Sequence, residues 1–287
     1  MKIIEGKSIA QEIKAEISKK IKTITGRKPG LAFLLIGSDP ASKIYVNLKY
    51  AGCKEVGIIS KILHLPSTIS EKELLTEIET LNQLREIDGI LIQQPLPKHL
   101  SSQKINETVN PEKDVDGFHP INQGKLLLGE NSGFVPCTPL GIAKLLEKIQ
   151  IDLSGKHVVI IGRSNIVGKP LAALLVQNKQ LFNATVTLAH SKTKNLSTLC
   201  KTADVLIAAA GQPDLIGKKC VKKGSVIIDV GINRDTNNRL VGDVNFNEVK
   251  NLCAAITPVP GGVGPMTIAM LLNNTLISYF RNIEKEN

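Results

Sequence analysis

Two residues that could do chemistry, Tyr45 and Lys49, lie four positions apart in the segment Ser42-Lys-Ile-Tyr-Val-Asn-Leu-Lys49. Side chains at this spacing lie on one face of a helix. A phenol can orient a planar ligand, and an amine partly withdrawn from water can carry protons. Solvated helices often carry the same pair, so the spacing alone does not identify a site.

The same Tyr-x-x-x-Lys spacing is found in short-chain dehydrogenases, where it follows an N-terminal dinucleotide site with a TGxxxGxG turn. Here the pair precedes the first glycine-rich turn that could bind a nucleotide, at Gly162, and no TGxxxGxG turn is present. The order of the motifs therefore excludes that family.

A glycine-rich turn, Gly162-Arg-Ser-Asn-Ile-Val-Gly168, follows the apolar run 157–161 and precedes a helical pattern. The amides of such a turn and the dipole of the following helix favour an anion. A P-loop is excluded, because five residues separate the glycines and Lys169 is followed by proline where Ser or Thr must bind magnesium. The GxGxxG fingerprint of a standard Rossmann fold is absent too.

The strand after this turn helps to choose the cofactor. An acid near its end would bind the ribose 2′-hydroxyl of NAD. Instead the run 184–189 ends in His190-Ser191-Lys192-Thr193, which contains no acid. Ser191 and Lys192, with the nearby Arg163, could bind a 2′-phosphate, so the sequence favours NADP over NAD. The alternative is that this is an ordinary βα turn whose basic residues are incidental.

Further polar side chains follow a predicted strand or lie in loops. Gln93 and Gln94 come directly after the apolar run Ile90-Leu-Ile92, where open parallel sheets bind ligands. Asp116 lies in Lys113-Asp-Val-Asp-Gly117 and could face a ligand or simply form an Asx turn with Gly117. The loop Thr257-Pro-Val-Pro-Gly-Gly-Val-Gly-Pro-Met-Thr267 is stiffened by proline and could let a ligand approach the backbone closely.

The elements that must position these residues alternate between helix and strand, which predicts α/β architecture with parallel sheets. The segment 106–135 is rich in turn residues and is the predicted domain boundary. Thr138 is expected to cap the helix that follows it. Helices are predicted over 8–25, 42–56, 70–86, 138–149, 169–178, 195–201 and 265–280, and strands over 31–36, 60–65, 88–93, 157–161, 184–189, 204–209 and 225–230.

Composition restricts the class of protein. The formal charge is +10, but the lysines are spread along the chain and aromatic residues make up only 3%, so we expect no nucleic-acid partner. No apolar run approaches the roughly 18 residues of a membrane span, and the N-terminus lacks a signal-peptide core. The five cysteines are scattered and the histidines lack ligand spacing, which predicts no disulfide, no metal and a cytoplasmic protein.

The motifs taken together resemble one family, the bifunctional methylenetetrahydrofolate dehydrogenase/cyclohydrolases (FolD family). The resemblance extends over essentially the whole chain, because six segments follow one another in the family's order. These segments are Tyr45-x-x-x-Lys49, Gln93-Gln-Pro-Leu-Pro97, Pro111-Glu-Lys-Asp-Val-Asp-Gly117, Pro136-Cys-Thr-Pro139, Gly162-Arg-Ser-Asn-Ile-Val-Gly168 and Pro258-Val-Pro-Gly-Gly-Val-Gly-Pro-Met-Thr267.

The resemblance implies an enzyme of one-carbon folate metabolism that oxidises 5,10-methylenetetrahydrofolate with NADP to 5,10-methenyltetrahydrofolate and hydrolyses the product to 10-formyltetrahydrofolate. Lys49 would be the catalytic lysine, chiefly for hydrolysis. Tyr45 would pack on the folate, Gln93 would hydrogen-bond Lys49, and Asp116 would bind the amino edge of the pterin.

The resemblance also implies the residues that contact the ligands and the domains that carry them. The folate pocket would further include Gln94, Pro260, Gly261, Gly262 and Gly264, and NADP would contact Gly162, Arg163, Ser164, Ser191 and Ile232. The expected fold has two three-layer domains, a catalytic folate-binding domain of residues 1–137 completed by a C-terminal helix, 266–287, and a Rossmann-like NADP-binding domain of residues 138–265. The family further implies a homodimer.

One departure from the family pattern concerns Gln94, where the family usually has leucine between Gln93 and the proline. The departure bears on folate affinity more than on the type of reaction. Two other readings stay open at this point: a hydroxyacid dehydrogenase of the shikimate type, which also joins a lysine to a C-terminal nucleotide domain, and a non-enzymatic NADP sensor.

Overall fold

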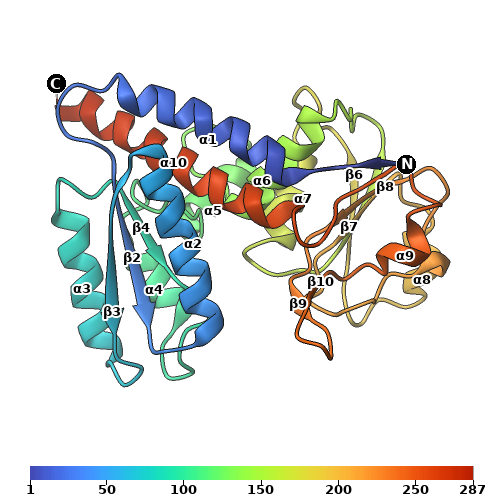
Figure 1. The fold of residues 1–287 in the computed structure, drawn as a ribbon, viewed down its shortest axis with the longest axis horizontal. Helices are drawn as coiled ribbons and strands as arrows, with labels where there is room; N and C mark the ends of the chain where they lie inside the picture. Colours follow the sequence, from blue (N-terminus) through green and yellow to red (C-terminus); the bar gives the residue numbers. More distant parts are fainter. Residues whose placement is uncertain (287) are drawn as a thin grey trace. The chain divides into compact units, whose positions relative to one another are not determined.

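The computed structural model describes residues 1–286, and the chain in it forms two compact units (Figure 1). The first, the Lys49 unit, consists of Gln11–Cys137 together with the chain from Ile268 onward. The second, the Gly162 unit, consists of Met1–Ala10 and Thr138–Thr267. Both are α/β units built on parallel sheets, as the sequence predicts.

The Lys49 unit contains a three-stranded parallel sheet in the order β3-β2-β4. The central strand β2 (Gly30–Ile36) is wholly apolar and every residue in it is buried, because helices cover both faces of the sheet. The neighbouring strands are β3 (Ile59–Leu65) and β4 (Gly89–Ile92). Ala32, Leu34 and Ile36 pack against α3 and α4, and Figure 1 shows α2 on the opposite side of the sheet from α3.

Capping residues and side-chain hydrogen bonds position the helices of this unit. Ser70 and Glu73 form a capping box at the start of α3. Asn274 of the last helix donates to the carbonyl of Val115 at 2.9 Å, and Ser278 donates to the carbonyl of Asp88 at 2.6 Å. The C-terminal helix therefore belongs in large part to this unit. The helices that lie wholly or mostly in this unit are α1 (Gly6–Lys22), α2 (Pro40–Val56), α3 (Glu71–Gln83), α4 (Ser102–Thr108), α5 (Pro120–Leu128) and α10 (Val263–Glu286).

The Gly162 unit contains a six-stranded parallel sheet in the order β1-β11-β8-β7-β5-β6. The chain winds from β5 (His157–Ile161) outward to β6 (Thr185–Ala189) and then back past β5 to β7 (Val205–Ala208). This reversal is the doubly wound topology, in which ligands bind beyond the carboxyl ends of the two strands at the switch point. In this unit those strands are β5 and β7.

The remaining elements of the Gly162 unit complete the sheet and cover it. A core cluster on the sheet includes Val159, Leu206 and Ile227 from three adjacent strands. The elements are β1 (Lys2–Ile3), α6 (Cys137–Lys148), α7 (Gly168–Leu175), α8 (Leu196–Cys200), a 3-10 turn at Lys218–Cys220, β8 (Val226–Asp229), the hairpin of β9 (Asn233–Arg234) and β10 (Leu240–Val241), α9 (Phe246–Val249) and β11 (Ala255–Ile256).

Several features differ from the sequence prediction. The segment 106–135 contains α5, whose start is capped by His119, in addition to its turns. Residues 1–10, assigned above to the first domain, group with the Gly162 unit because β1 pairs in parallel with β11. Thr138 does not cap a helix: α6 already begins at Cys137, and the Thr138 hydroxyl bonds that of Thr267 at 3.0 Å.

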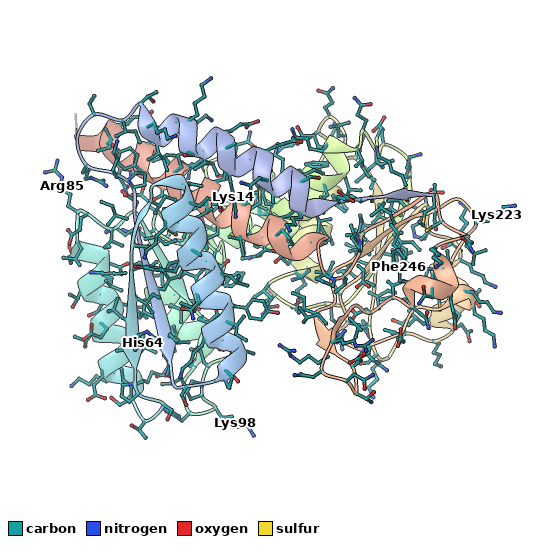
Figure 2. All side chains as sticks on the ribbon, viewed as in Figure 1. Lys14, His64, Arg85, Lys98, Lys223 and Phe246 are labelled. Carbon is teal, nitrogen blue, oxygen red and sulfur yellow. The ribbon has the colours of Figure 1, made fainter. Side chains whose placement is uncertain are left out.

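Basic side chains of the Lys49 unit are dispersed. Lys14 lies on α1, while Arg85 and Lys98 lie in turns, and Figure 2 shows these two near opposite ends of the unit. Some of these cations are paired, as Lys14 is with Glu55 at 2.8 Å. These three basic residues therefore do not belong to one basic stripe.

Candidate active site

Lys49 is positioned by α2, a helix with both ends fixed. Asp39 caps the N-terminus by accepting from the amide of Ser42 at 2.7 Å, and Gly57 ends the helix in the left-handed conformation. Tyr45 and Lys49 lie one turn apart, and both are half-buried. The helix thus presents a phenol and an ammonium side by side, as their spacing predicts.

Gln93 holds the ammonium of Lys49. Lys49 Nζ donates to Gln93 Oε1 at 3.0 Å, while Gln93 Nε2 donates to the carbonyl of Gln94 at 2.6 Å. The backbone amide of Gln93 continues the sheet by donating to the carbonyl of Leu34 at 3.0 Å. The amide side chain is therefore fixed with its oxygen toward Lys49, and Gln94 lies beside it, half-buried, before a cis peptide bond to Pro95.

Asp116 is the third member of this cluster. Burial raises the pKa of its carboxyl group above the usual range, and the nearby positive charge of Lys49 acts to lower that pKa. The thiol of Cys137 hydrogen-bonds this carboxylate, and burial, together with the charge of Asp116, raises the pKa of the thiol well above its usual value. Lys49, Gln93 and Asp116 thus come together from three separate segments of one unit.

The loop that carries Asp116 is held by Asp114. One carboxylate oxygen of Asp114 accepts from the amide of Phe118 at 3.0 Å, and the other accepts from the amide of His119 and the side chain of Asn122, both at 2.8 Å. Gly117 follows at a φ of 78°, and a Cβ there would lie 2.6 Å from the nitrogen of Pro136. The structure therefore assigns the loop-forming role to Asp114 and leaves the carboxyl group of Asp116 buried within the influence of the Lys49 charge.

The Gly162 turn lies beyond β5, at the switch point of the doubly wound sheet. Gly162 has a φ of 129°, and a Cβ on it would lie 2.1 Å from the carbonyl oxygen of Ala209, the residue that follows β7. A Cβ on Gly168 would lie 2.0 Å from the carbonyl oxygen of Gly162. Only glycine fits at either position, so the backbone forms a compact turn ahead of α7 while Arg163 and Ser164 stay exposed.

The other predicted cofactor residues lie on two further loops at this edge of the sheet. After β6, the amide of His190 donates to the hydroxyl of Thr193 at 2.9 Å, which forms a tight turn with Ser191 and Lys192 exposed on it. After β8, Ile232 is 49% exposed, unusually high for an isoleucine beside a buried strand. The residues predicted to contact NADP therefore lie on three loops that follow β5, β6 and β8.

The glycine loop predicted to line the folate pocket belongs to the Gly162 unit. It is fixed to the start of α1, because the amide of Lys7 donates to the carbonyl of Gly261 at 2.9 Å and a Cβ on Gly6 would lie 1.9 Å from the oxygen of Gly262. Pro260 follows a cis peptide bond. At Gly264 a Cβ would meet nothing within 4 Å, so this glycine leaves open space beside the backbone.

Sequence reasoning missed two buried acids of the Gly162 unit, Asp229 and Asp243. Asp229 ends the strand β8, and Asp243 follows Gly242 after the hairpin. A carboxylate directly after the apolar run Val226-Ile-Ile228 was a signal that could have identified the first of them, because buried acids need compensating donors.

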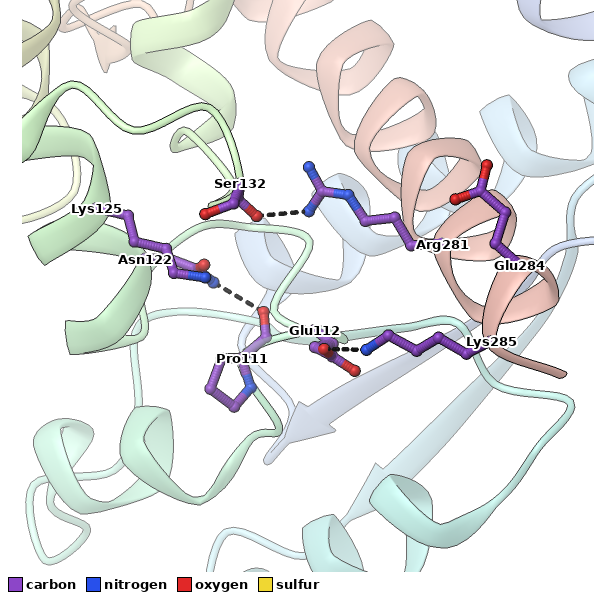
Figure 3. Close-up of a pocket in the computed structure, with 8 residues that line it drawn as sticks. All are labelled: Pro111, Glu112, Asn122, Lys125, Ser132, Arg281, Glu284 and Lys285. Carbon is purple, nitrogen blue, oxygen red and sulfur yellow. Dashed lines mark hydrogen bonds and ion pairs between the residues drawn. The ribbon is translucent and has the colours of Figure 1, made fainter.

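A surface cavity of about 320 Å³ lies elsewhere in the Lys49 unit, between α10 and the loops around α5 (Figure 3). Its charged lining groups are Glu112, Lys125, Arg281, Glu284 and Lys285. Arg281 donates to the carbonyl of Ser132 and Lys285 pairs with Glu112. None of the predicted catalytic, folate or NADP residues lines this cavity.

Within residues 1–286 no cluster of three or more His, Cys, Asp or Glu side chains is arranged to hold a metal ion. Nor does any helix in that part of the chain have the length and apolar character needed to cross a membrane.

Comparison with known proteins identifies the family to which the chain belongs. A family profile described as "Tetrahydrofolate dehydrogenase/cyclohydrolase, catalytic domain" matches residues 4–116, and one described as "Tetrahydrofolate dehydrogenase/cyclohydrolase, NAD(P)-binding domain" matches residues 136–283. The "Bifunctional protein FolD" of Protochlamydia amoebophila is 58% identical over 286 residues, which cover 98% of each chain.

Solved structures agree with this. A bifunctional FolD methylenetetrahydrofolate dehydrogenase/cyclohydrolase from Campylobacter jejuni superimposes with a TM-score of 0.95 at 49% identity, covering 98% of this chain and 99% of the other. The Trypanosoma brucei FolD, solved with NADP cofactor and an inhibitor, gives a TM-score of 0.92 at 35% identity, covering 98% of each chain. With a lysine cluster in one unit and a doubly wound nucleotide fold in the other, the chain belongs to the tetrahydrofolate dehydrogenase/cyclohydrolase family.

Proposed function

We propose that the protein oxidises 5,10-methylenetetrahydrofolate with NADP to 5,10-methenyltetrahydrofolate, and then hydrolyses this product to 10-formyltetrahydrofolate. The observation that carries the proposal is the cluster of Lys49, Gln93 and Asp116, in which an ammonium is hydrogen-bonded to an amide and its charge acts on a buried carboxyl group. Loss of hydride from the methylene carbon leaves a cationic methenyl carbon, and this carbon is the electrophile for water. One site can therefore serve both steps.

The residues of the Gly162 turn fit the phosphates of a dinucleotide. The two glycines bring backbone atoms so close that no side chain fits, and the polar turn leads into a helix whose dipole favours an anion. Gly162, Arg163, Ser164, Ser191 and Ile232 would hold NADP, which when bound supplies the acceptor for the hydride. Ser191, Lys192 and Arg163 would bind the 2′-phosphate.

Lys49 is the central group for hydrolysis. Water adds to the methenyl carbon and releases one proton to solvent. The bond from that carbon to N5 then breaks, so the second proton of the water must move from the oxygen to the departing nitrogen. Lys49 would activate the water or protonate the nitrogen, and Gln93 would hold the amine in place through the 3.0 Å hydrogen bond. These roles make Lys49 the catalytic residue of the hydrolytic step.

The folate would be held by the groups around the lysine. Tyr45 would pack on the ring system, Asp116 would accept from the amino edge of the pterin, and Gln94 would contact the ligand beside Gln93. Pro260, Gly261, Gly262 and Gly264 would line the pocket with backbone. The carboxylate of Asp116 suits the contact with the pterin amino group, because a hydrogen bond to a charged acceptor is stronger than one to a neutral acceptor.

The dehydrogenase is tested by mixing the purified protein with 5,10-methylenetetrahydrofolate and NADP and following the absorbance of NADPH. We expect NADPH to form. If neither NADP nor NAD is reduced, the dehydrogenase assignment is wrong. A protein that binds NADPH without turnover would be a sensor, and activity on a hydroxyacid of the shikimate type would place it in the other dehydrogenase class.

The preference for NADP can be tested at the turns after β5 and β6, which carry Arg163 and Lys192. Replacement of Lys192 or Arg163 by alanine removes a cation and should raise the KM for NADP about tenfold while changing that for NAD little, since NAD lacks the 2′-phosphate. Equal changes in both KM values would contradict the assignment of these residues to the 2′-phosphate.

We further propose a cytoplasmic homodimer. The five cysteines are buried free thiols, which suits a reducing compartment. β6 is an edge strand of the six-stranded sheet with Leu188 36% exposed, and such an edge can be covered by a second copy. Analytical ultracentrifugation would contradict the homodimer if the protein sedimented as a 31.0 kDa monomer at micromolar concentration.

A further inference from the structure

Two buried carboxylates of the Gly162 unit, Asp229 and Asp243, have no part in the functions described so far. Asp243 is 0% exposed and Asp229 is 4% exposed. Burying a carboxylate is costly unless hydrogen-bond donors surround it. The hydrogen-bond donors around these two acids show which segments of the chain the acids hold in place.

Asp243 binds two loops at once. One of its oxygens, Oδ2, accepts from the amides of Ala210 at 2.6 Å and Gly211 at 3.0 Å. The other, Oδ1, accepts from the amide of Gln212 at 2.9 Å and from the Asn233 side chain at 2.8 Å. The first three donors belong to the loop after β7, and the fourth follows Ile232 directly.

Asp229 holds the backbone around Asp243 in place by hydrogen bonds. Its Oδ1 accepts from the amides of Gly231 at 3.0 Å and Asp243 at 2.9 Å, and its Oδ2 accepts from the amide of Val244 at 3.0 Å. Burial raises the pKa of Asp229 to about 6, and the charge of Asp243 adds to this rise.

Glycines allow the backbone to approach these acids. A Cβ on Gly242 would lie 1.8 Å from Asp229 Oδ2, and a Cβ on Gly231 would lie 2.4 Å from Asp243 Oδ1. No other residue fits at either position without moving a carboxylate. The segments 229–233 and 242–244 are therefore built around the pair of acids.

The same network reaches the Gly162 turn. The amide of Ala209 donates to the carbonyl of Ile161 at 2.8 Å, and its carbonyl is in close contact with Gly162. The next three residues of that loop donate to Asp243. A continuous set of contacts, which passes through the Asp243 carboxylate and the Asn233 side chain, thus joins Gly162 on one side to the residue after Ile232 on the other.

We propose that Asp243, supported by Asp229, is a positioning residue that sets the Gly162 turn and the Ile232 loop at the spacing that NADP requires. This inference rests on the cofactor role given to those residues above. A carboxylate is suited to the task, because it accepts from four N–H donors and carries no hydrogen of its own. An asparagine at position 243 would direct an NH2 group toward two of these donors.

The test is the affinity for NADPH, measured by the fluorescence of the bound cofactor, for the parent and for Asp243→Asn. We expect the Kd to rise about 10- to 100-fold, since the charge is lost and two N–H donors lose their acceptor. In steady-state assays the KM for NADP should rise by a similar factor, with a much smaller change in kcat at saturating NADP. A residue that merely stabilised the fold would not produce this split.

Two further variants make the result decisive. Asn233→Ala removes only the donor to Asp243 Oδ1 at a half-buried position, and it should raise the Kd about 3- to 10-fold even if Asp243→Asn fails to fold. Asp152→Asn is the matched control, because Asp152 is an exposed acid of the same unit that accepts only from the amide of Ser154 among the bonds described for it.

Three outcomes would overturn the inference. If both Asp243→Asn and Asn233→Ala bind NADPH within twofold of the parent, Asp243 does not position the cofactor loops. If Asp243→Asn lowers the thermal midpoint but leaves the Kd unchanged, its role is structural only. If the parent itself binds no NADPH, the cofactor assignment fails together with the inference, and this result is distinguishable from the other two.

Discussion

The hydrogen bond between Lys49 and Gln93 makes the hydrolytic role of the lysine testable without removing the lysine itself. In Gln93→Leu an apolar side chain of similar length replaces a side chain that is only 9% exposed, so the packing is largely kept. The substitution removes the acceptor that lies 3.0 Å from Lys49 Nζ. The ammonium then loses the partner that fixes its position, while its neighbour Asp116 remains.

The size of the effect follows from the strength of that bond. Hydrogen bonds to charged groups contribute about 1.5–3 kcal/mol, and each 1.4 kcal/mol corresponds to a factor of about ten. If the whole contribution is needed in the transition state, kcat for hydrolysis of 5,10-methenyltetrahydrofolate should fall by about 10- to 150-fold. The assay follows the loss of absorbance of the methenyl compound without NADP.

The neighbouring residue provides the matched control. Gln94→Leu makes the same chemical change one position along the chain, at a side chain that makes no described bond to Lys49 and where the family usually has leucine. We expect it to change the KM for the folate more than kcat. If Gln93→Leu hydrolyses the substrate with a kcat within twofold of the parent and has the same thermal midpoint, the positioning of Lys49 by Gln93 is refuted.

Two other predictions concern the loops on which the two sites depend. Gly168→Ala places a Cβ 2.0 Å from the carbonyl oxygen of Gly162, so the turn must open; we expect at least a tenfold weaker Kd for NADPH by fluorescence titration, and an unchanged Kd would contradict the compact turn. Burial raises the pKa of Asp114 to about 7, from 3.8 in the free side chain, so its favourable contribution to stability is full below pH 4 and lost as pH rises to 7. The side chain of Asp114→Asn cannot titrate, so the variant lacks this pH dependence. Between pH 4 and pH 7 the free energy of unfolding of the parent, measured with urea, should therefore fall by roughly 4 kcal/mol relative to that of the variant. A difference that stays constant with pH would contradict the raised pKa.

Local patterns were sufficient for much of the fold. The strand predicted over 31–36 is β2 (Gly30–Ile36), and the helix predicted over 70–86 is α3, which begins at Glu71. The membership in the folate enzyme family, inferred from the order of the motifs, is confirmed by the comparisons. Each of these signals is contained in a few consecutive residues or in their order along the chain.

Features that depend on distant segments could not be predicted. β1 and β11 have two residues each, too few to show any periodicity, and they become strands only by pairing with each other and with β8. Asp243 is surrounded by amides about 30 positions away in the chain, so no local spacing marks it. The individual roles of Tyr45, Lys49, Asp116 and the glycine loops likewise stay predictions until variants are assayed.

The central claim, that Lys49 carries out the hydrolysis, is tested most directly by Lys49→Ala assayed with 5,10-methenyltetrahydrofolate. We expect this variant to lose hydrolysis to 10-formyltetrahydrofolate while it keeps the thermal midpoint and the NADPH affinity of the parent. Hydrolysis at the full rate of the parent would contradict the account and remove Lys49 from its role.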